Sequence, residues 1–244
     1  MTLYMISIGL SDEKDVTIRG LEAIKKCDVV YLESYTSKLG CSIEKLEKFY
    51  GKKIILADRD LVEKKAEETI LKGAKEKNVG FLVIGDPFGA TTHIDLRLRA
   101  KKLGISVKVI HNASILTAIG VTGLELYKFG KTTSIPFHNE DVKSPIEVLH
   151  TNQVNHLHTL FLLDLDPINN NFMTIANAID YLIKNNIGNK TKCIGCAGLG
   201  SEKPEIKSGT LEEVKSYNFT KFPQCLIIPS SLHFVEKEAF DMWK

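Results

Sequence analysis

Short apolar runs alternate with amphipathic stretches along the first half of the chain, and this alternation limits the folds that it can adopt. The runs have the length of strands, whereas apolar residues recur at helical spacing in the stretches between them. Such a pattern predicts a mostly parallel sheet covered by helices. We expect strands at 3–8, 29–32, 53–56, 79–84 and 107–110, and helices at 17–26, 42–49, 60–77 and 94–103, the third of these helices capped by Asp60.

The second half has a less regular pattern, which predicts a separate domain with a mixed sheet. Strands are expected at 133–136, 159–163, 193–197 and 225–228, and helices at 114–121 and 174–184. The stretch 167–172 contains three consecutive asparagines and is expected to be a loop. We therefore predict an α/β protein of two domains, 1–112 and 113–244, with a ligand cleft between them.

Composition excludes several classes of protein. The net charge is +2, from 32 basic and 30 acidic residues, which argues against a nucleic-acid-binding protein. The longest apolar runs are too short to span a bilayer, so no membrane partner is expected. No secretory signal is visible, and the five irregularly spaced cysteines are typical of reduced thiols. These features favour a cytoplasmic protein.

The segment Gly85–His93 follows a buried strand and opens a helix. Its small residues permit a ligand to approach the backbone closely. Asp86 stands at the carboxyl end of the strand, where open α/β sheets bind ligands. The segment is either a binding site or a capped turn with a structural aspartate, and its residues alone favour neither.

The segment His111–Ile115 ends the next strand and starts another helix. Ser114 either caps that helix or contacts a ligand at the same edge of the sheet as Asp86. The first strand ends in a turn with a single glycine, Gly9, rather than in G-x-G-x-x-G. A nicotinamide cofactor is therefore not expected on this turn.

Three other groups of residues contain side chains that bind metals or carry out redox chemistry, but their sequence context favours structural roles. Cys193 and Cys196 lie on an apolar strand without the further ligands that a structural zinc needs, so buried thiols are expected. Asp164 and Asp166 are interpreted as a strand end. His156 and His158 are interpreted as a polar strand entry, so no metal site is predicted.

Several motifs, in order, resemble the diphthine synthase family of tetrapyrrole-methylase-like methyltransferases. Gly85–His93 and His111–Ile115 carry the resemblance most clearly. Further matching segments are Leu3-Tyr4, Gly9-Leu10, Asp15–Thr17, Tyr35–Ser37, Tyr127–Gly130, His158–Leu160, Leu163-Asp164 and Leu232-His233. At Gly89 and Asn112-Ala113 the chain is closer to the eukaryotic members.

The resemblance implies a homodimer whose S-adenosylmethionine lies folded in the cleft between two α/β domains and leaves as S-adenosylhomocysteine. Cofactor contacts would fall on Leu10, Asp86, Gly89, Ser114, Ile115, Leu163, Leu199 and His233. The chain departs from the family pattern at Ser7 and Ser11, where glycines are usual, and at Gly198, where an arginine is usual.

The implied reaction methylates an aminocarboxypropyl group on a histidine of translation elongation factor 2, in diphthamide biosynthesis. Three methyls quaternise the amine, and a fourth in eukaryotic members esterifies the carboxylate. Positioning supplies most of the acceleration, so no metal is needed and no catalytic base is assigned. The alternatives are a small-molecule methylase acting on a tetrapyrrole and a cofactor-binding module without turnover.

Overall fold

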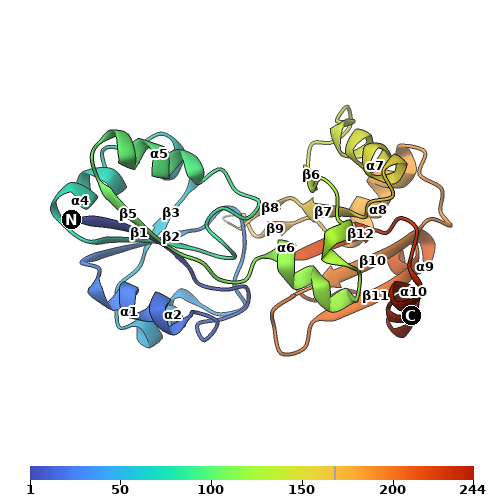
Figure 1. Cartoon of the computed structure of the whole chain (residues 1–244), viewed down its shortest axis with the longest axis horizontal. Helices are drawn as coiled ribbons and strands as arrows, with labels where there is room; N and C mark the ends of the chain where they lie inside the picture. The colour runs from blue at the N-terminus through green and yellow to red at the C-terminus, as the bar shows by residue number, and fades with distance from the viewer. Residues whose placement is uncertain (168) are drawn as a thin grey trace. The chain divides into compact units, whose positions relative to one another are not determined.

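The computed structural model of the chain describes residues 1–167 and 169–244. It divides into two compact units, the first formed by Met1–Leu116 together with Pro167 and Asn169, and the second by Thr117–Asp166 and Asn170–Lys244. The chain passes from one to the other inside the short helix α6 (Ile115–Ala118), a few residues after the predicted boundary. Each unit has its own sheet and core (Figure 1).

A parallel sheet forms the centre of the first unit, in the order β3-β2-β4-β1-β5. Its strands are β1 (Thr2–Ser7), β2 (Val29–Glu33), β3 (Ile55–Ala57), β4 (Val79–Val83) and β5 (Ser106–Ile110). Met5 of β1 lies opposite Phe81 of β4 and Val109 of β5. Because neighbouring strands run parallel, the turns that follow β4, β1 and β5 meet at one edge, as predicted for the turns after β4 and β5.

Helices cover both faces of this sheet (Figure 1). Helices α1 (Ile18–Lys26) and α2 (Ile43–Tyr50) pack on one face, where Ile24 and Leu46 join its core. Helices α3 (Arg59–Glu63), α4 (Ile70–Glu76) and α5 (Ile94–Lys102) pack on the other face. Burial of both faces explains why all five residues of β4 are buried and why its sequence is uniformly apolar.

The predicted single helix over 60–77 is wrong, because the structure has two helices there. Asp58 rather than Asp60 caps α3, accepting a hydrogen bond from the Leu61 backbone N–H at 2.8 Å. The Asp60 carboxylate instead pairs with Lys64 and Lys65. The helix ends near Lys64 and restarts at Ile70, yet Val62, Ala66 and Ile70 all stay buried, so the apolar spacing did not reveal the break.

The second unit contains a mixed sheet in the order β11-β10-β12-β7-β6. Its strands are β6 (Thr133–Ile135), β7 (Thr159–Leu163), β10 (Lys192–Ala197), β11 (Glu205–Thr210) and β12 (Gln224–Ile228). The β6–β7 pair is parallel and the other pairs are antiparallel. The predicted α/β architecture, with a parallel and a mixed sheet, is confirmed.

Helices α7 (Ser144–Val154), α8 (Ile175–Lys184) and α9 (Leu211–Lys215) pack on one face of this sheet. Helix α10 (Phe234–Met242) is joined to β11 by hydrogen bonds from Ser208 to the carbonyls of Phe240 and Trp243. Two 3-10 helices, η1 (Ile119–Thr122) and η2 (Leu126–Lys128), precede β6.

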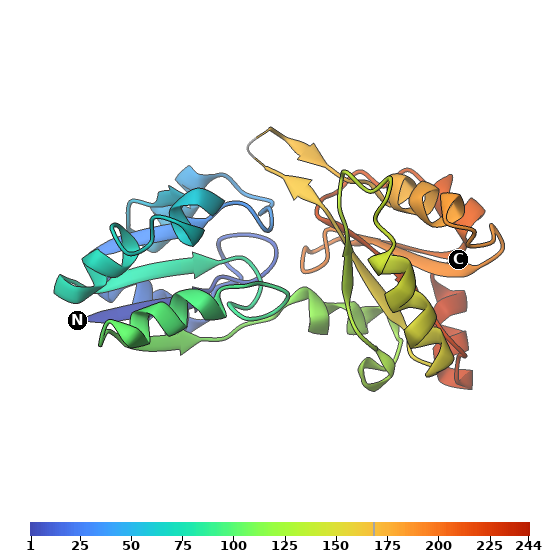
Figure 2. The ribbon, with the colours of Figure 1, turned by 90° about the horizontal axis from the view of Figure 1, so that it is seen from above.

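A small hairpin occupies part of the predicted loop over 167–172. Strands β8 (Leu165–Asp166) and β9 (Asn171–Phe172) pair antiparallel and extend away from the main sheet of the second unit (Figure 2). The loop prediction is therefore wrong for Asn171–Phe172, and Ile168 lies outside the described residues. Within the described ranges, no helix is both long and apolar enough to cross a membrane.

Candidate active site

The turns after β1 and β4 are joined backbone to backbone. Gly9 and Gly85 form a bridge in which the Gly85 N–H donates to the Gly9 carbonyl at 2.8 Å. Both have φ near +80°, a conformation that favours glycine. Ser7 donates its hydroxyl hydrogen to the Gly85 carbonyl, so the serine that replaces a usual glycine ties the same two turns together.

Asp15 holds the first turn in shape. Its Oδ2 accepts hydrogen bonds from the backbone N–H groups of Leu10 and Ser11, at 3.2 and 2.7 Å. The Asp15 carbonyl accepts a hydrogen bond from Asn112 Nδ2 at 2.7 Å. Asn112 belongs to the turn after β5, so these contacts join the first turn to the third.

Asp86 is the polar centre of this edge. Its Oδ1 accepts the Phe88 backbone N–H at 2.9 Å, and its Oδ2 lies 2.6 Å from His111 Nδ1. The Asp86 side chain is largely buried, whereas the His111 side chain is 66% exposed. A carboxylate has about four acceptor positions, so Asp86 keeps acceptor capacity for a ligand.

Four predicted cofactor residues of the first unit lie together. A Cβ added to Gly89 would lie 3.1 Å from Ser114 Cβ and 3.4 Å from Asp86 Cβ, so the three residues are in close contact. One added to Gly85 would lie 3.9 Å from the Leu10 side chain. Ile115, the fifth, follows Ser114 directly and begins α6. The structure thus gathers these five residues at one sheet edge.

The predicted residues of the second unit separate into two places. Leu163 ends β7 and Leu199 follows the end of β10, which meet at the same edge of the sheet. His233 follows β12 at its opposite end, where Ile228 pairs with Thr159. A five-residue strand separates its ends by roughly 13 Å. The structure brings Leu163 and Leu199 to one edge and leaves His233 at the other.

Gly198, where the family pattern has an arginine, stands at a position that disfavours a side chain. It has φ +61°, and a Cβ there would lie 3.1 Å from both Cβ and Cδ of Lys221. The Lys221 side chain crosses this position, and its ammonium donates to the Lys203 carbonyl. An arginine at this position would meet both backbone strain and the Lys221 side chain.

A buried network surrounds Glu236, and no spacing in the sequence signals it. Glu236 is fully buried, and its carboxylate accepts hydrogen bonds from Lys128 Nζ at 2.5 Å and His158 Nε2 at 2.9 Å. It also accepts backbone N–H groups of Glu125 and His233. Burial raises the pKa of Glu236, but these donors outweigh it and lower that pKa to about 2.

His158 lies directly before β7, as interpreted, but it is also a buried member of this network, which that interpretation did not include. It is completely buried, and its Nδ1 accepts the Ser230 N–H at 2.9 Å. Because Nδ1 accepts, Nε2 carries the hydrogen that is donated to Glu236. Burial lowers the pKa of His158, against the opposing effect of Glu236. Lys128 Nζ also donates to the Ser231 carbonyl, so the network fixes the segment before α10.

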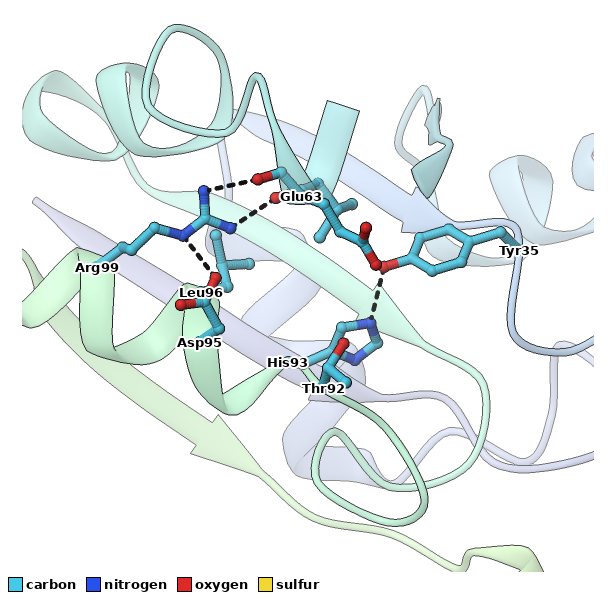
Figure 3. Close-up of a pocket in the computed structure, with 8 residues that line it drawn as sticks. Tyr35, Glu63, Thr92, His93, Asp95, Leu96 and Arg99 are labelled. Carbon is cyan, nitrogen blue, oxygen red and sulfur yellow. Dashed lines mark hydrogen bonds and ion pairs between the residues drawn. The ribbon is translucent and has the colours of Figure 1, made fainter. Parts of the chain in front are cut away.

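A hollow of about 340 Å³ lies beside α3 and α5 in the first unit (Figure 3). Tyr35, Glu63, His93 and Arg99 line it. The Arg99 guanidinium is held by Asp95, by Glu67 and by the carbonyls of Val62 and Glu63. The charged group of Arg99 is therefore engaged in joining α3 to α5.

The cysteines of β10 lie inside the sheet. Cys193 and Cys196 are both completely buried, and Cys196 lies opposite Cys225. Burial raises the pKa of the Cys193 thiol, so the reactive thiolate form is disfavoured. Among the described residues no group of three histidine, cysteine or acidic side chains is arranged to hold a metal ion.

Comparison with known proteins defines the class of this chain. The family described as Tetrapyrrole (Corrin/Porphyrin) Methylases matches residues 2–215. The chain therefore belongs to this methylase family, and it is a methyltransferase.

The relatives narrow the class further. A diphthine methyl ester synthase of Dictyostelium discoideum is 47% identical, with 100% of this chain and 98% of the relative covered. A diphthine synthase of Methanocella arvoryzae is 41% identical, with coverage of 97% and 96%. A diphthine synthase crystal structure matches with a TM-score of 0.94 and 37% identity, covering 100% of this chain and 96% of the other. The chain belongs to the diphthine synthase family, as its motifs suggested.

Proposed function

We propose that this protein is a diphthine methyl ester synthase that uses S-adenosylmethionine to methylate translation elongation factor 2 in diphthamide biosynthesis. The observation that carries the proposal is the full-length similarity to enzymes with that name. The acceptor is the aminocarboxypropyl group on a histidine of the factor. Because a translation factor is the substrate, the protein acts in the cytoplasm.

The first-unit edge suits such a cofactor. The backbone of Gly89 lies close to Asp86 and Ser114, where even a Cβ would be in tight contact with Ser114. The Asp86 carboxylate is positioned to accept hydrogen bonds from a bound ammonium or hydroxyl. We assign cofactor contacts to Leu10, Asp86, Gly89, Ser114 and Ile115, with Leu163 and Leu199 contributing from the second unit. His233 lies at the other edge of its sheet, where its backbone N–H is bonded to Glu236 and its side chain is exposed, so its cofactor contact stays a prediction.

The bound cofactor supplies a methyl group on a sulfonium, which is already a strong electrophile. The protein must then hold the acceptor in line with that methyl and provide a neutral amine. Three additions give a quaternary amine without a lone pair, so a fourth methyl must go to the carboxylate. That carboxylate is ionised at neutral pH and loses no proton when it reacts.

Mass spectrometry tests the proposal. Elongation factor 2 carrying the unmethylated intermediate is incubated with the protein and excess S-adenosylmethionine, and the modified peptide is weighed before and after mild alkali. We expect four methyl increments, of which one is labile to alkali. Three increments, all stable to alkali, would contradict ester formation but not the methylation of the amine. No methylation would overturn the proposal and favour a tetrapyrrole substrate or a binding module without turnover.

A further inference from the structure

We propose that His111 is the base that takes the proton from the acceptor amine, with Asp86 orienting its imidazole ring. This inference rests on the proposed function, because the amine is that of the proposed acceptor. An aliphatic amine is largely protonated at neutral pH and has no free lone pair in that form. Each of the first three methylations therefore requires the loss of one proton.

The contact with Asp86 determines which ring nitrogen of His111 is available. Nδ1 lies 2.6 Å from Asp86 Oδ2, and a carboxylate only accepts hydrogen bonds, so Nδ1 carries the hydrogen. In the neutral ring, Nε2 then holds the lone pair. Asp86 is fixed in turn by the Phe88 backbone N–H on its other oxygen.

Packing restricts the ring further. The Phe88 and His111 rings meet edge to face, with centroids 6.2 Å apart. The Arg97 guanidinium stacks over the Phe88 ring at 5.6 Å. Two charged groups are thus placed around His111, Asp86 in direct contact and Arg97 of α5 behind Phe88. A carboxylate that binds one nitrogen of an imidazole and leaves the other to accept a proton is the arrangement expected of a general base.

Exposure distinguishes His111 from the buried histidines. A base that serves three successive methylations must return three protons to water. The His111 side chain is 66% exposed, whereas His93 and His158 are buried. In each cycle one N–H bond of the acceptor ammonium breaks and one forms at Nε2. The imidazolium then loses this proton to water, and the amine keeps the electron pair.

His111→Asn is the informative variant, because the asparagine amide can stand where Nδ1 stands and still donate to Asp86. At pH 7 we expect the first N-methylation of elongation factor 2 to slow by about 100-fold, a typical contribution of a general base. Methylation of the carboxylate on an already trimethylated acceptor requires no base and should keep the wild-type rate. Affinity for S-adenosylhomocysteine, measured by calorimetry, should also stay unchanged.

Raising the pH provides an independent readout. As the free-amine fraction of the acceptor grows, the deficit of His111→Asn in N-methylation should shrink, and added imidazole should partly rescue His111→Ala. His150→Asn, at an exposed histidine of α7, is the matched control and should behave as wild type.

The outcomes separate this inference from the proposed function. N-methylation by His111→Asn at the wild-type rate at pH 7 would overturn the role of His111 alone. So would an equal slowing of N- and O-methylation, or a deficit that is independent of pH. If the wild-type protein adds only three methyls, there is no O-methylation to compare. The pH dependence of N-methylation by His111→Asn then tests the role of His111. Wild-type protein that methylates the factor at no position would overturn the proposed function and this inference with it.

Discussion

Asp86 combines two tasks, since one of its oxygens shapes the turn at Phe88 and the other holds His111. Asp86→Ala should weaken the binding of S-adenosylhomocysteine by about 10- to 100-fold, because a charge-assisted hydrogen bond contributes roughly 1.5–3 kcal/mol. Isothermal titration calorimetry measures this affinity. Asp86→Asn removes the charge but keeps an oxygen that can accept the Phe88 N–H. It therefore tests the effect of the charge separately from that of the turn geometry. An unchanged dissociation constant in both variants would assign Asp86 a structural role.

His93 should make the stability of the protein depend on pH. It is 2% exposed and packs against the Phe81 and Tyr35 rings. Burial lowers its pKa to about 4, with the Pro87 carbonyl opposing the shift. Because the folded pKa lies below the unfolded value near 6.5, the neutral ring stabilises the fold above pH 6.5. This stabilisation is lost as the pH falls toward 4.

Urea unfolding at pH 7.5 and pH 4.5 measures that loss. We expect His93 to account for roughly 2–3 kcal/mol of the decrease in unfolding free energy between the two pH values. His93→Gln should reduce the decrease by this amount, whatever its effect on stability at pH 7.5. His150→Gln, at an exposed position, should leave the decrease as in wild type. Equal pH dependence in wild type and His93→Gln would contradict the prediction.

At the scale of elements, Glu236 joins parts of the second unit that are distant in sequence. It lies on α10 and contacts η2, through Lys128, and the start of β7, through His158. Removing one partner of a buried ion pair costs roughly 3–5 kcal/mol because the other charge is left uncompensated. Glu236→Gln should therefore lower the thermal midpoint by roughly 6–12 °C.

Thermal unfolding followed by circular dichroism tests this, with Glu238→Gln as the control. Glu238 is on the same helix but is exposed, so its variant should unfold within about 2 °C of wild type. A Glu236→Gln midpoint equal to that of the control would show that the network contributes no net stability.

The sequence predicted regular elements well where a local pattern specifies them. The uniformly apolar β4 and the amphipathic α8, capped by Thr174, were expected on hydrophobic pattern and lie where predicted. The break between α3 and α4 was not predictable, because Val62, Ala66 and Ile70 keep helical spacing across it and remain buried. Local periodicity reports which face is apolar, and it does not report whether the backbone is continuous.

The candidate site was predictable in part for the same reason. The turns after β4 and β5 could be placed at one edge because parallel strands align their carboxyl ends. The Asp86–His111 contact joins residues 25 positions apart, and the His158–Glu236 contact joins residues 78 apart. No spacing in the sequence signals such pairs, since they depend on strand order and on where α10 packs. Pairing through tertiary structure explains why the buried contact of His158 with Glu236 was not predicted.

At the scale of the whole molecule, the C-terminal helix bears on oligomeric state. Its apolar side chains divide into two groups in the structure. Phe240 is buried, and the Trp243 indole N–H donates to the Thr122 carbonyl, so these two residues pack within their own unit. Phe234 and Met242 remain 67% and 66% exposed. Only part of the apolar segment is therefore exposed on a single chain, namely the side chains of Phe234 and Met242.

We predict that the protein is a homodimer, on the resemblance to the diphthine synthase family together with these exposed side chains. Two-fold closure of a 27.2 kDa chain gives a particle of about 54 kDa. Light scattering coupled to gel filtration at micromolar concentration measures the mass directly.

If α10 contributes to the interface, the double variant Phe234→Asp with Met242→Asp should shift the mass toward that of one chain, because two buried carboxylates would face an apolar surface without partners. Lys237→Asp, at an exposed polar position of the same helix, controls for the added charge. A wild-type mass of about 27 kDa would contradict the dimer, whereas a double variant that remains at about 54 kDa would place the interface away from α10.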